Sequence, residues 1–432
     1  MSRLDKTAGF KMEGAKRASS FRSWSAAQGI TTNGIDYCEI PNSGLGIVAK
    51  RRLEAGEELV NVPFPALVTI NTVPKAFREK HNPITTQGLL AAFLASSNIE
   101  KTAYAPWADT WPALASFRES MPICWPQHRK AALTQDLLDE TTSHHEWDLP
   151  FPSAIDHSSA NFPGAGFEAD PNLSLLQKQR KKLKADWERV GEALPNMSFE
   201  RYIHYWLLVN TRTFYFEMPN VRTHPPRDDR IVMCPFIDLF NHQDTGCNVQ
   251  FADTGYTVTT DRTYDAGDQV YVSYGRHSND FLLVEYGFVL SSNRWDSTPV
   301  DHCLMAHLVN TPVEEQLRRA GYLGGYFLNN DGVCYRTQVA VRAQLLPEQS
   351  WNDFIAGRNF DDTRHEDQAQ ALLASQVLGP YLQEAEGALE RLQRSFEASS
   401  STFRRSYRIL IQRWEQIRAL LQRAAKGPVV GS

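Results

Sequence analysis

Residues 232–290 decide the fold of this chain, and they read VMCPFIDLFNHQDTGCNVQFADTGYTVTTDRTYDAGDQVYVSYGRHSNDFLLVEYGFVL. An apolar segment from Met233 to Phe240 ends on the polar pair Asn241-His242. Apolar and polar residues then alternate from Tyr256 to Thr260 and again from Gln269 to Tyr274, as is typical of half-buried strands. Polar side chains and glycines therefore recur where strands end, and strand ends are where a rigid scaffold usually places chemistry.

The motifs of this stretch, in their order and spacing, resemble the catalytic half of the SET-domain protein methyltransferases. They are Asp238-x-x-Asn241-His242, Gly267-Asp268, Tyr274-Gly275, Asn279, Leu282-Leu283 and Tyr286-Gly287-Phe288. The spacing is most similar to the branch that contains the Rubisco large-subunit lysine methyltransferase, the fungal ribosomal-protein lysine methyltransferases and the actin histidine methyltransferase. The resemblance is good over residues 42–67 and 210–290, loose between them, and architectural only after Asp301.

A glycine motif near the N-terminus, Gly44-Leu45-Gly46, belongs to the same resemblance. With Ala49 it has the spacing of a dinucleotide fingerprint, which requires a following helix. Residues 50–62 contain a glycine and end at a proline, so they predict strand, turn and strand instead. In the SET family such a turn lets the backbone approach the cofactor, because glycine has no Cβ. The resemblance thus implies that Gly44, Leu45 and Gly46 contact S-adenosylmethionine, with a plain β-turn as the alternative.

The resemblance also implies roles for the other motif residues. Tyr274 corresponds to the catalytic tyrosine, and Tyr286 lines the channel for the substrate lysine. The implied cofactor-binding residues are Gly44, Leu45, Gly46, Arg212, Asn241, His242 and Tyr274, and the implied channel residues are Phe214, Tyr286 and Phe288. Two alternatives without a functional role stay open. Arg212 would form a surface salt bridge, or His242 would be a turn residue whose side chain is hydrogen-bonded within the protein.

Methyl transfer to an amine can be argued from the chemistry alone. The nucleophile must be neutral, whereas a lysine at neutral pH is almost entirely protonated. A narrow aromatic channel favours the neutral amine by desolvation, and the sulfonium charge of S-adenosylmethionine favours it by repulsion. Tyrosines suit such a channel, since their faces tolerate a cation and their hydroxyls can aim the amine. Alignment, rather than a strong base, then supplies most of the acceleration.

Composition limits the partners and the compartment. The chain has 432 residues, 42% of them hydrophobic, and a net charge of −5, so no global positive field attracts nucleic acid or membrane. Its six cysteines are scattered without a C-x-x-C pair, which argues for a reducing compartment and against structural zinc. His144, His145 and His157 have no thiols near them, so no metal site is expected. The scattered cysteines also depart from the histone-directed members of the resembled family, which carry cysteine-rich zinc clusters, so the resemblance implies a non-histone substrate. We predict a monomeric cytoplasmic protein, and the nucleus stays open as a second location.

The order of strand-like and helical segments along the chain predicts an α+β fold. With the resemblance, this implies a SET-type β-fold of small sheets that carries a helical insert and an all-helical C-terminal lobe. The expected divisions are a flexible N-terminus (1–34), the first SET part (35–95), a helical insert (96–209) with an exposed loop (141–172), the catalytic SET part (210–291) and a substrate-docking lobe (292–432). Helices are expected at 173–194 and 198–216, and a helical hairpin at 382–396 and 403–421. The positive bias of the N-terminus leaves a mitochondrial presequence as an alternative.

One turn sequence occurs twice. Leu53–Glu57 and Tyr264–Asp268 both read x-acid-Ala-Gly-acid before an apolar strand. We therefore expect both hairpins to belong to one small-sheet assembly.

These observations predict an S-adenosylmethionine-dependent methyltransferase that modifies a lysine of a ribosomal or other cytosolic protein. The alternatives are a protein-histidine methyltransferase and a SET-derived binding module that has lost turnover. In the histidine-directed enzyme of the branch, a polar residue replaces the phenylalanine of Arg-x-Phe and the tyrosine of Tyr-Gly-Phe is lost. Phe214 and Tyr286 stand here as in the lysine enzymes. A buried imidazole also needs a partner for its second ring nitrogen, which Phe214 cannot supply.

Overall fold

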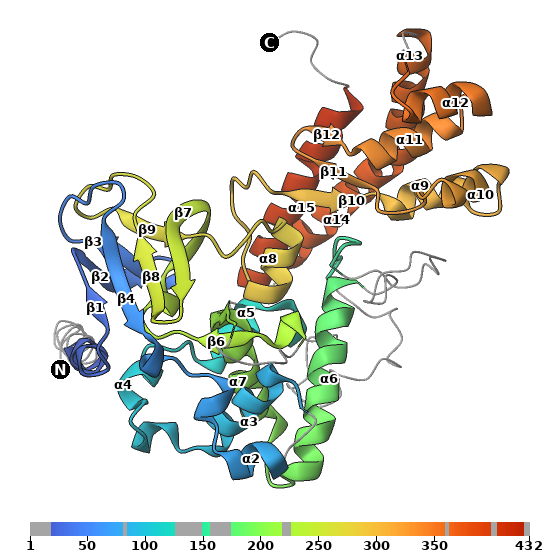
Figure 1. Ribbon diagram of the computed structural model, residues 1–432. Helices are drawn as coiled ribbons and strands as arrows, with labels where there is room; N and C mark the ends of the chain where they lie inside the picture. Colours follow the sequence, from blue (N-terminus) through green and yellow to red (C-terminus); the bar gives the residue numbers. More distant parts are fainter. Residues whose placement is uncertain are drawn as a thin grey trace. The chain divides into compact units, whose positions relative to one another are not determined.

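The computed structural model describes residues 19–80, 84–125, 149–155, 174–217, 226–358, 363–398 and 404–426. Of these, the residues before 118 and those from 181 to 276 form one compact unit, and the residues from 118 to 180 and after 276 form a second (Figure 1). His144, His145, His157, most of the predicted exposed loop and the expected link between the C-terminal helices lie outside the described residues.

A seven-stranded sheet forms the core of the first unit, in the order β1-β4-β8-β7-β9-β3-β2. Its strands are β1 (Thr31–Thr32), β2 (Ile35–Ile40), β3 (Gly44–Ala49), β4 (Glu58–Pro63), β7 (Asn241–Ala252), β8 (Gly255–Thr259) and β9 (Gln269–Val272). Neighbouring strands pair antiparallel except β7 and β9, which run parallel. The strands expected from alternation at 256–260 and 269–274 are thereby confirmed as β8 and β9, within one or two residues.

The repeated turn sequence marks a real structural relationship. Leu53 and Tyr264 pair with each other in an antiparallel bridge, in which each amide donates to the other carbonyl at 2.9 and 3.1 Å. The glycines of the two turns, Gly56 and Gly267, both have left-handed backbones, with φ of 81° and 95°. One turn leads to β4 and the other to β9, so both belong to the same sheet, as expected.

Helices pack beneath the sheet in the first unit (Figure 1). The helices up to the end of the insert are α2 (Lys75–Lys80), α3 (Thr86–Ser96), α4 (Ala105–Ala108), α5 (Leu114–Ser120), α6 (Leu175–Ala193) and α7 (Phe199–Arg212), with short 3₁₀ turns at Phe64–Ala66, Ile70–Thr72, Ile99–Lys101, Pro122–Cys124, Arg227–Asp229 and Ile237–Leu239. The buried carboxylate of Asp186 on α6 accepts hydrogen bonds from Thr85, the N-cap of α3, and from Trp206 on α7. One side chain therefore ties three helices together.

The predicted helix 198–216 is too long at its C-terminal end. Ser198 caps the helix as expected, because its hydroxyl accepts the amide of Arg201. Helix α7 ends at Arg212, however, and Thr213–Tyr215 form β5, which pairs antiparallel with β6 (Ile231–Met233). A β-branched and aromatic segment that finds a strand partner prefers the extended conformation, and this tertiary pairing could not be read from the local sequence.

The second unit is mainly helical, whereas the sequence led us to expect an all-helical C-terminal lobe. Its helices are α8 (Asn279–Tyr286), α9 (Asp301–Leu308), α10 (Pro312–Arg319), α11 (Tyr335–Ala343), α12 (Glu348–Ile355), α13 (Thr363–Leu372), a π-helical turn (Leu373–Leu378), α14 (Gly379–Ala398) and α15 (Arg404–Ala425). A small antiparallel sheet, which the sequence did not predict, joins β10 (Ser297–Pro299), β11 (Phe327–Asn329) and β12 (Gly332–Val333). Strands of two or three residues are too short to show an alternating pattern.

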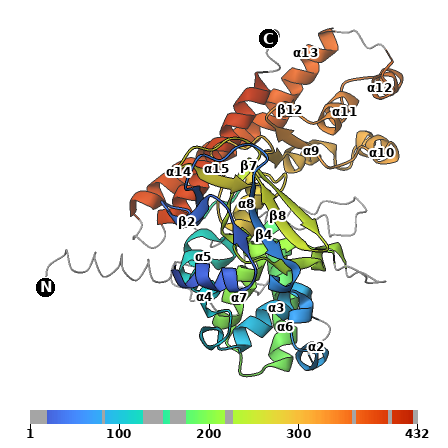
Figure 2. The ribbon, with the colours of Figure 1, turned by 60° about the vertical axis from the view of Figure 1, so that its left-hand side comes forward.

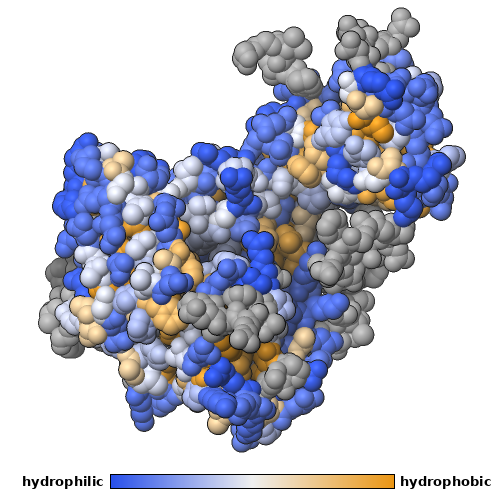
Figure 3. Space-filling model, viewed as in Figure 1, coloured by the Kyte–Doolittle hydropathy of each residue, from blue (hydrophilic) through white to orange (hydrophobic). Residues whose placement is uncertain are grey.

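The predicted helical hairpin is present as α14 and α15, which pack along each other (Figure 2). Their facing side chains include Tyr381 and Trp414, whose rings meet edge to face at 6.1 Å and are fully buried. No helix among the described ranges is both long and apolar enough to cross a lipid bilayer. On the face drawn in Figure 3, hydrophilic residues cover most of the surface and apolar residues form small scattered patches, which is ordinary for a protein surface.

Candidate cofactor site

Strand β9 brings two distant motifs together. On one side it pairs with β3, where Val48 is opposite Gln269, and on the other side with β7, where Asn241 is opposite Tyr271. A Cβ placed on Gly46 would lie 2.6 Å from Asn241 Nδ2 and 2.7 Å from Gln269 Nε2. The predicted Gly-x-Gly motif and the predicted Asn-His motif thus meet at one point of the sheet.

The two glycines of the first motif are required for different structural reasons. Gly44 follows a turn closed by a hydrogen bond from the Ser43 amide to the Ile40 carbonyl, and its φ of 73° favours glycine. A Cβ on Gly44 would meet nothing within 4 Å, so Gly44 is needed for its conformation. Gly46 has no such backbone requirement and is needed for close approach. Leu45, between them, is half-buried on β3.

Two side-chain amide nitrogens, those of Asn241 and Gln269, lie beside Gly46. Asn241 Nδ2 and Gln269 Nε2 are buried, and neither has a hydrogen-bond partner within the part of the chain that the structure describes. The other end of the Gln269 amide is fixed, because its Oε1 accepts the Tyr271 hydroxyl at 2.7 Å. Buried donors are nearly always paired, so these two fit a ligand that brings acceptor atoms, such as the carboxylate and ring nitrogens of S-adenosylmethionine.

Sequence reasoning found Asn241 but missed Gln269. The only sequence signal for Gln269 was its place directly after the Gly267-Asp268 turn. A glutamine at the start of a strand is common, and only the tertiary position of Gly46 shows that its amide nitrogen lies beside that of Asn241.

His242 holds the tyrosine that the sequence marked as catalytic. The backbone amide of Tyr274 donates to His242 Nδ1 at 3.0 Å, and the two rings stack with centroids 4.9 Å apart. Since Nδ1 accepts, the neutral ring carries its proton on Nε2. The Tyr274 hydroxyl donates to the Phe240 carbonyl at 2.7 Å. His242 is 5% exposed, and its Nδ1 fixes the backbone where β9 ends.

Arg212 makes a buried ion pair rather than a surface salt bridge. Its Nη1 lies 3.1 Å from Asp238 Oδ2 and also donates to the Asp238 carbonyl, while Trp107 donates to the same carboxylate oxygen. The Asp238 side chain is fully buried. Burial raises the pKa of the Asp238 carboxyl, and the Arg212 guanidinium opposes that rise. Arg212 thereby anchors the start of Asp238-x-x-Asn241-His242, and the cofactor contact that the resemblance implies for it stays a prediction.

The predicted channel residues fall in both units. Phe214 lies on β5 of the first unit, where its half-buried ring packs 5.9 Å from that of Tyr256. Tyr286 ends α8 in the second unit, and its ring lies 6.3 Å from that of Phe288. Gly287, with φ 80°, caps the helix in the left-handed conformation between them.

The last turn of α8 is fixed from α6. Gln179 Nε2 donates to the Val284 carbonyl at 2.9 Å and to the Glu285 carboxylate at 3.1 Å. Burial, with a smaller contribution from the neighbouring Glu285, raises the pKa of Tyr286 to about 12. The Tyr286 hydroxyl therefore stays protonated at physiological pH. Over the described ranges, no group of three or more His, Cys, Asp or Glu side chains could hold a metal ion.

Comparisons with solved structures identify the fold. The structure of Rubisco LSMT bound to AdoMet superposes with a TM-score of 0.54 over 95% of this chain and 92% of that one, at 15% identity. This chain has the SET fold. The SET domain of LSMT bound to lysine and AdoHcy gives a TM-score of 0.55 at 14% identity, over 95% and 90% of the two chains. The predicted α+β SET-type fold is confirmed.

Similar curated sequences belong to the same branch of SET proteins. The ribosomal lysine N-methyltransferase set11 of Schizosaccharomyces pombe is 24% identical over 79% of this chain and 78% of its own length. The ribosomal lysine N-methyltransferase 2 of Saccharomyces cerevisiae is 23% identical over 60% of this chain and 56% of its own length. The mouse SET domain-containing protein 4 is 21% identical over 92% and 89%. No protein-family model matches the chain. The resemblance expected from the motifs is confirmed.

Proposed function

We propose that this SET protein transfers a methyl group from S-adenosylmethionine to a lysine of a non-histone protein. The observation that carries the proposal is the convergence of Gly46, Asn241 and Gln269. It leaves two buried donors without an acceptor among the described residues, next to a backbone that no Cβ obstructs. His242, which binds the Tyr274 amide, directly follows Asn241 on β7, and Tyr274 lies two residues after β9, the strand that begins with Gln269.

Each residue of the first unit then has a distinct task. Gly44, Leu45 and Gly46 would present backbone to the cofactor, and Asn241 and Gln269 would donate to its polar atoms. Arg212 holds Asp238 and thereby the strand that carries Asn241. When bound, S-adenosylmethionine supplies an electrophilic methyl group on a sulfonium.

Tyr274 would act at the transfer axis. Its ring is fixed by stacking on His242, and its hydroxyl is oriented by the Phe240 carbonyl. The Tyr274 hydroxyl is bound to the Phe240 carbonyl and the Tyr274 amide is bound to His242. The tyrosine therefore has little freedom to rotate. Such preorganisation suits a reaction whose rate depends on alignment.

Lysine is the acceptor that fits the channel residues. Phe214 offers only an apolar ring, which suits the alkyl stem of lysine and leaves a buried imidazole nitrogen without a partner. Several similar proteins are named lysine methyltransferases, and three of them are named ribosomal lysine N-methyltransferases. We therefore propose a ribosomal or other cytoplasmic protein as substrate and a monomeric enzyme.

The test is calorimetric titration of S-adenosylmethionine into the wild type and into Asn241→Ala and Gln269→Ala. We expect each substitution to weaken binding by roughly tenfold, the order of one hydrogen bond to a charged group. The control is Gln250→Ala, an exposed position on the same strand β7 as Asn241. A wild type that binds no S-adenosylmethionine would overturn the proposal, and a wild type that binds it without transferring label to protein would favour the silent binding module.

A further inference from the structure

Asn279 closes a loop that carries two predicted channel residues. Its Nδ2 donates to the Leu290 carbonyl at 3.1 Å, and its Oδ1 accepts the Leu290 amide at 3.1 Å. The side chain thus pairs with both backbone groups of one residue, as a neighbouring strand would. Asn279 is buried, and the loop from 279 to 290 that it closes contains Tyr286 and Phe288.

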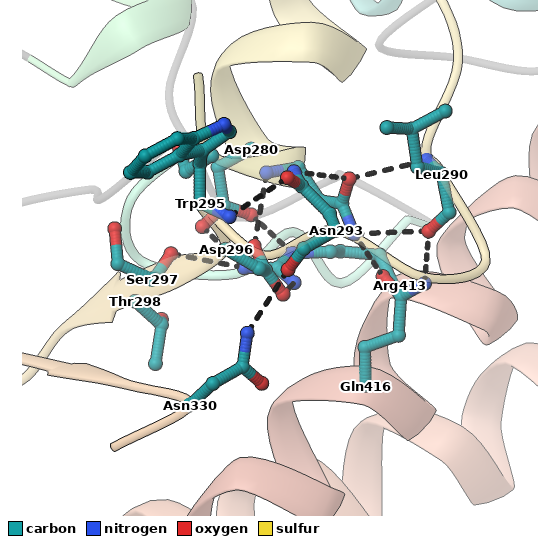
Figure 4. Close-up of polar contacts among 12 residues, drawn as sticks. Asp280, Leu290, Asn293, Trp295, Asp296, Ser297, Thr298, Asn330, Arg413 and Gln416 are labelled. Atoms are coloured by element: carbon teal, nitrogen blue, oxygen red, sulfur yellow. Dashed lines mark hydrogen bonds and ion pairs between the residues drawn. The ribbon is translucent and has the colours of Figure 1, made fainter. Parts of the chain in front are cut away.

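Helix α15 reaches this closure through Gln416. Its Nε2 donates to the Leu290 carbonyl at 2.7 Å, and its Oε1 accepts Asn279 Nδ2 at 2.9 Å. Figure 4 shows Gln416 extending from the helix toward Leu290. One glutamine therefore contacts both ends of the closed loop.

One turn earlier on α15, Arg413 binds the start of α8. Its Nε and Nη2 contact the two oxygens of Asp280 at 2.7 and 2.8 Å, and its Nη1 contacts Asp296 at 2.7 Å (Figure 4). The second oxygen of Asp296 accepts a hydrogen bond from the backbone amide of Asn279 at 2.9 Å. This amide belongs to the first turn of α8, whose N–H groups have no acceptor within the helix. Two carboxylates thus share one guanidinium, and all three side chains are buried.

A buried cluster of this kind is an expensive way to stabilise a fold. Desolvation of two carboxylates and a guanidinium offsets most of their attraction, and apolar side chains of similar volume often serve as well. What the cluster does supply is a fixed position, because a guanidinium that donates two hydrogen bonds to one carboxylate holds it in a single orientation. Arg413 and Gln416 together fix both the start of α8 and the end of the loop after it.

We infer that α15 positions the loop 279–290 for methyl transfer, with Arg413 and Gln416 as positioning residues for Tyr286. The role given to Tyr286 rests on the proposed function, whereas the ordering of the loop by α15 can be measured without it. A helix more than 100 residues further along the sequence would then be part of the structure that builds the substrate channel.

The test compares Arg413→Met with Arg408→Met, which removes the same charge from an exposed position of α15. Hydrogen–deuterium exchange of peptides within 279–290 should be about tenfold faster or more in Arg413→Met, because two buried carboxylates lose their partner. Arg413→Lys, which keeps the charge without the bidentate geometry, should lie between Arg413→Met and the wild type. Arg408→Met should match the wild type.

Activity gives the second measurement. For Arg413→Met, kcat for transfer to protein of a cell extract should fall by about tenfold or more, while the Kd for S-adenosylmethionine changes by less than about twofold, since the cofactor site lies in the first unit. If Arg413→Met does not fold, Gln416→Leu removes two hydrogen bonds without leaving a charge, and it should accelerate exchange of residues 287–290. Wild-type exchange of 279–290 in a folded Arg413→Met or Gln416→Leu protein would overturn the inference. Failure of the proposed function would show separately, as absent S-adenosylmethionine binding by the wild type.

Discussion

The backbone amide of Tyr274 donates a hydrogen bond to Nδ1 of His242 across 3.0 Å, and the two rings lie stacked. The last residue of the Asn-His motif thus fixes the first residue of the Tyr-Gly motif. The two motifs are separate in sequence, yet the pairing of β7 with β9 places His242, near the start of β7, opposite Val272, two residues before Tyr274. His242 is therefore a positioning residue for the tyrosine as well as a candidate neighbour of the cofactor.

Replacing His242 should reveal this positioning role. His242→Leu removes the acceptor of the partly buried Tyr274 amide, which costs about 1–3 kcal/mol and should lower kcat by roughly tenfold or more. His242→Asn can place an amide oxygen near the position of Nδ1 and should recover part of the loss. Steady-state kinetics with circular dichroism as a folding control decide the matter, and two variants with equal kcat would argue against the hydrogen bond as the cause.

Gly46 should tolerate no side chain without loss of cofactor. A methyl group at Gly46 would press on Asn241 and Gln269, so Gly46→Ala should weaken S-adenosylmethionine binding by about tenfold or more. Gly191→Ala is the matched control, because a Cβ there would meet open space. Calorimetry measures both. Equal affinities in the two folded variants would remove Gly46 from the site.

Tyr274→Phe isolates the hydroxyl. The ring and its stacking on His242 are kept, while the hydrogen bond to the Phe240 carbonyl is lost. We expect kcat to fall by about tenfold or more, with a much smaller change in S-adenosylmethionine affinity. Turnover near the wild-type value would move the catalytic role away from Tyr274, and Tyr286→Phe would be the next variant to assay.

The stability of the chain should depend on Tyr286 at alkaline pH. The pKa of Tyr286 is raised to about 12 by burial and by Glu285, whereas an unfolded tyrosine titrates near pH 10. The folded chain holds the proton more tightly, so this stabilisation is fully present below about pH 10 and is lost as the pH rises toward 12. Between about pH 9 and about pH 11 the wild type should lose more free energy of unfolding than Tyr286→Phe, as measured by urea denaturation. The other buried tyrosines titrate in both proteins and cancel in the comparison, so equal losses would contradict the shift.

Much of the fold could be predicted because its signals are local. The alternation in 256–260 and 269–274 matches β8 and β9, and the repeated acid-Ala-Gly-acid turn led to the expectation of one assembly that the pairing of Leu53 with Tyr264 confirms. The spacing of the motifs indicated the SET branch, and the comparisons confirm it.

What could not be predicted depends on tertiary contacts. The orphan amide of Gln269 and the end of α7 at Arg212 arise from strand pairing between distant segments. Arg413 reads in sequence as one more charged residue between the apolar positions of α15, although it is 0% exposed. Only the positions of Asp280 and Asp296 show that it is paired.

The most direct measurement of the central claim is the identity of the methylated residue. Purified chain is incubated with S-adenosylmethionine labelled in its methyl group and with protein of a cell extract, and the labelled protein is hydrolysed for amino-acid analysis. Tyr274→Phe serves as the matched control for label that the chain does not transfer. Because Phe214 and Tyr286 both suit a lysine, we predict that the label is recovered as methyl-lysine in the wild-type reaction and is strongly reduced in the control. Label recovered as methylhistidine without methyl-lysine, or no labelled amino acid at all, would contradict the assignment.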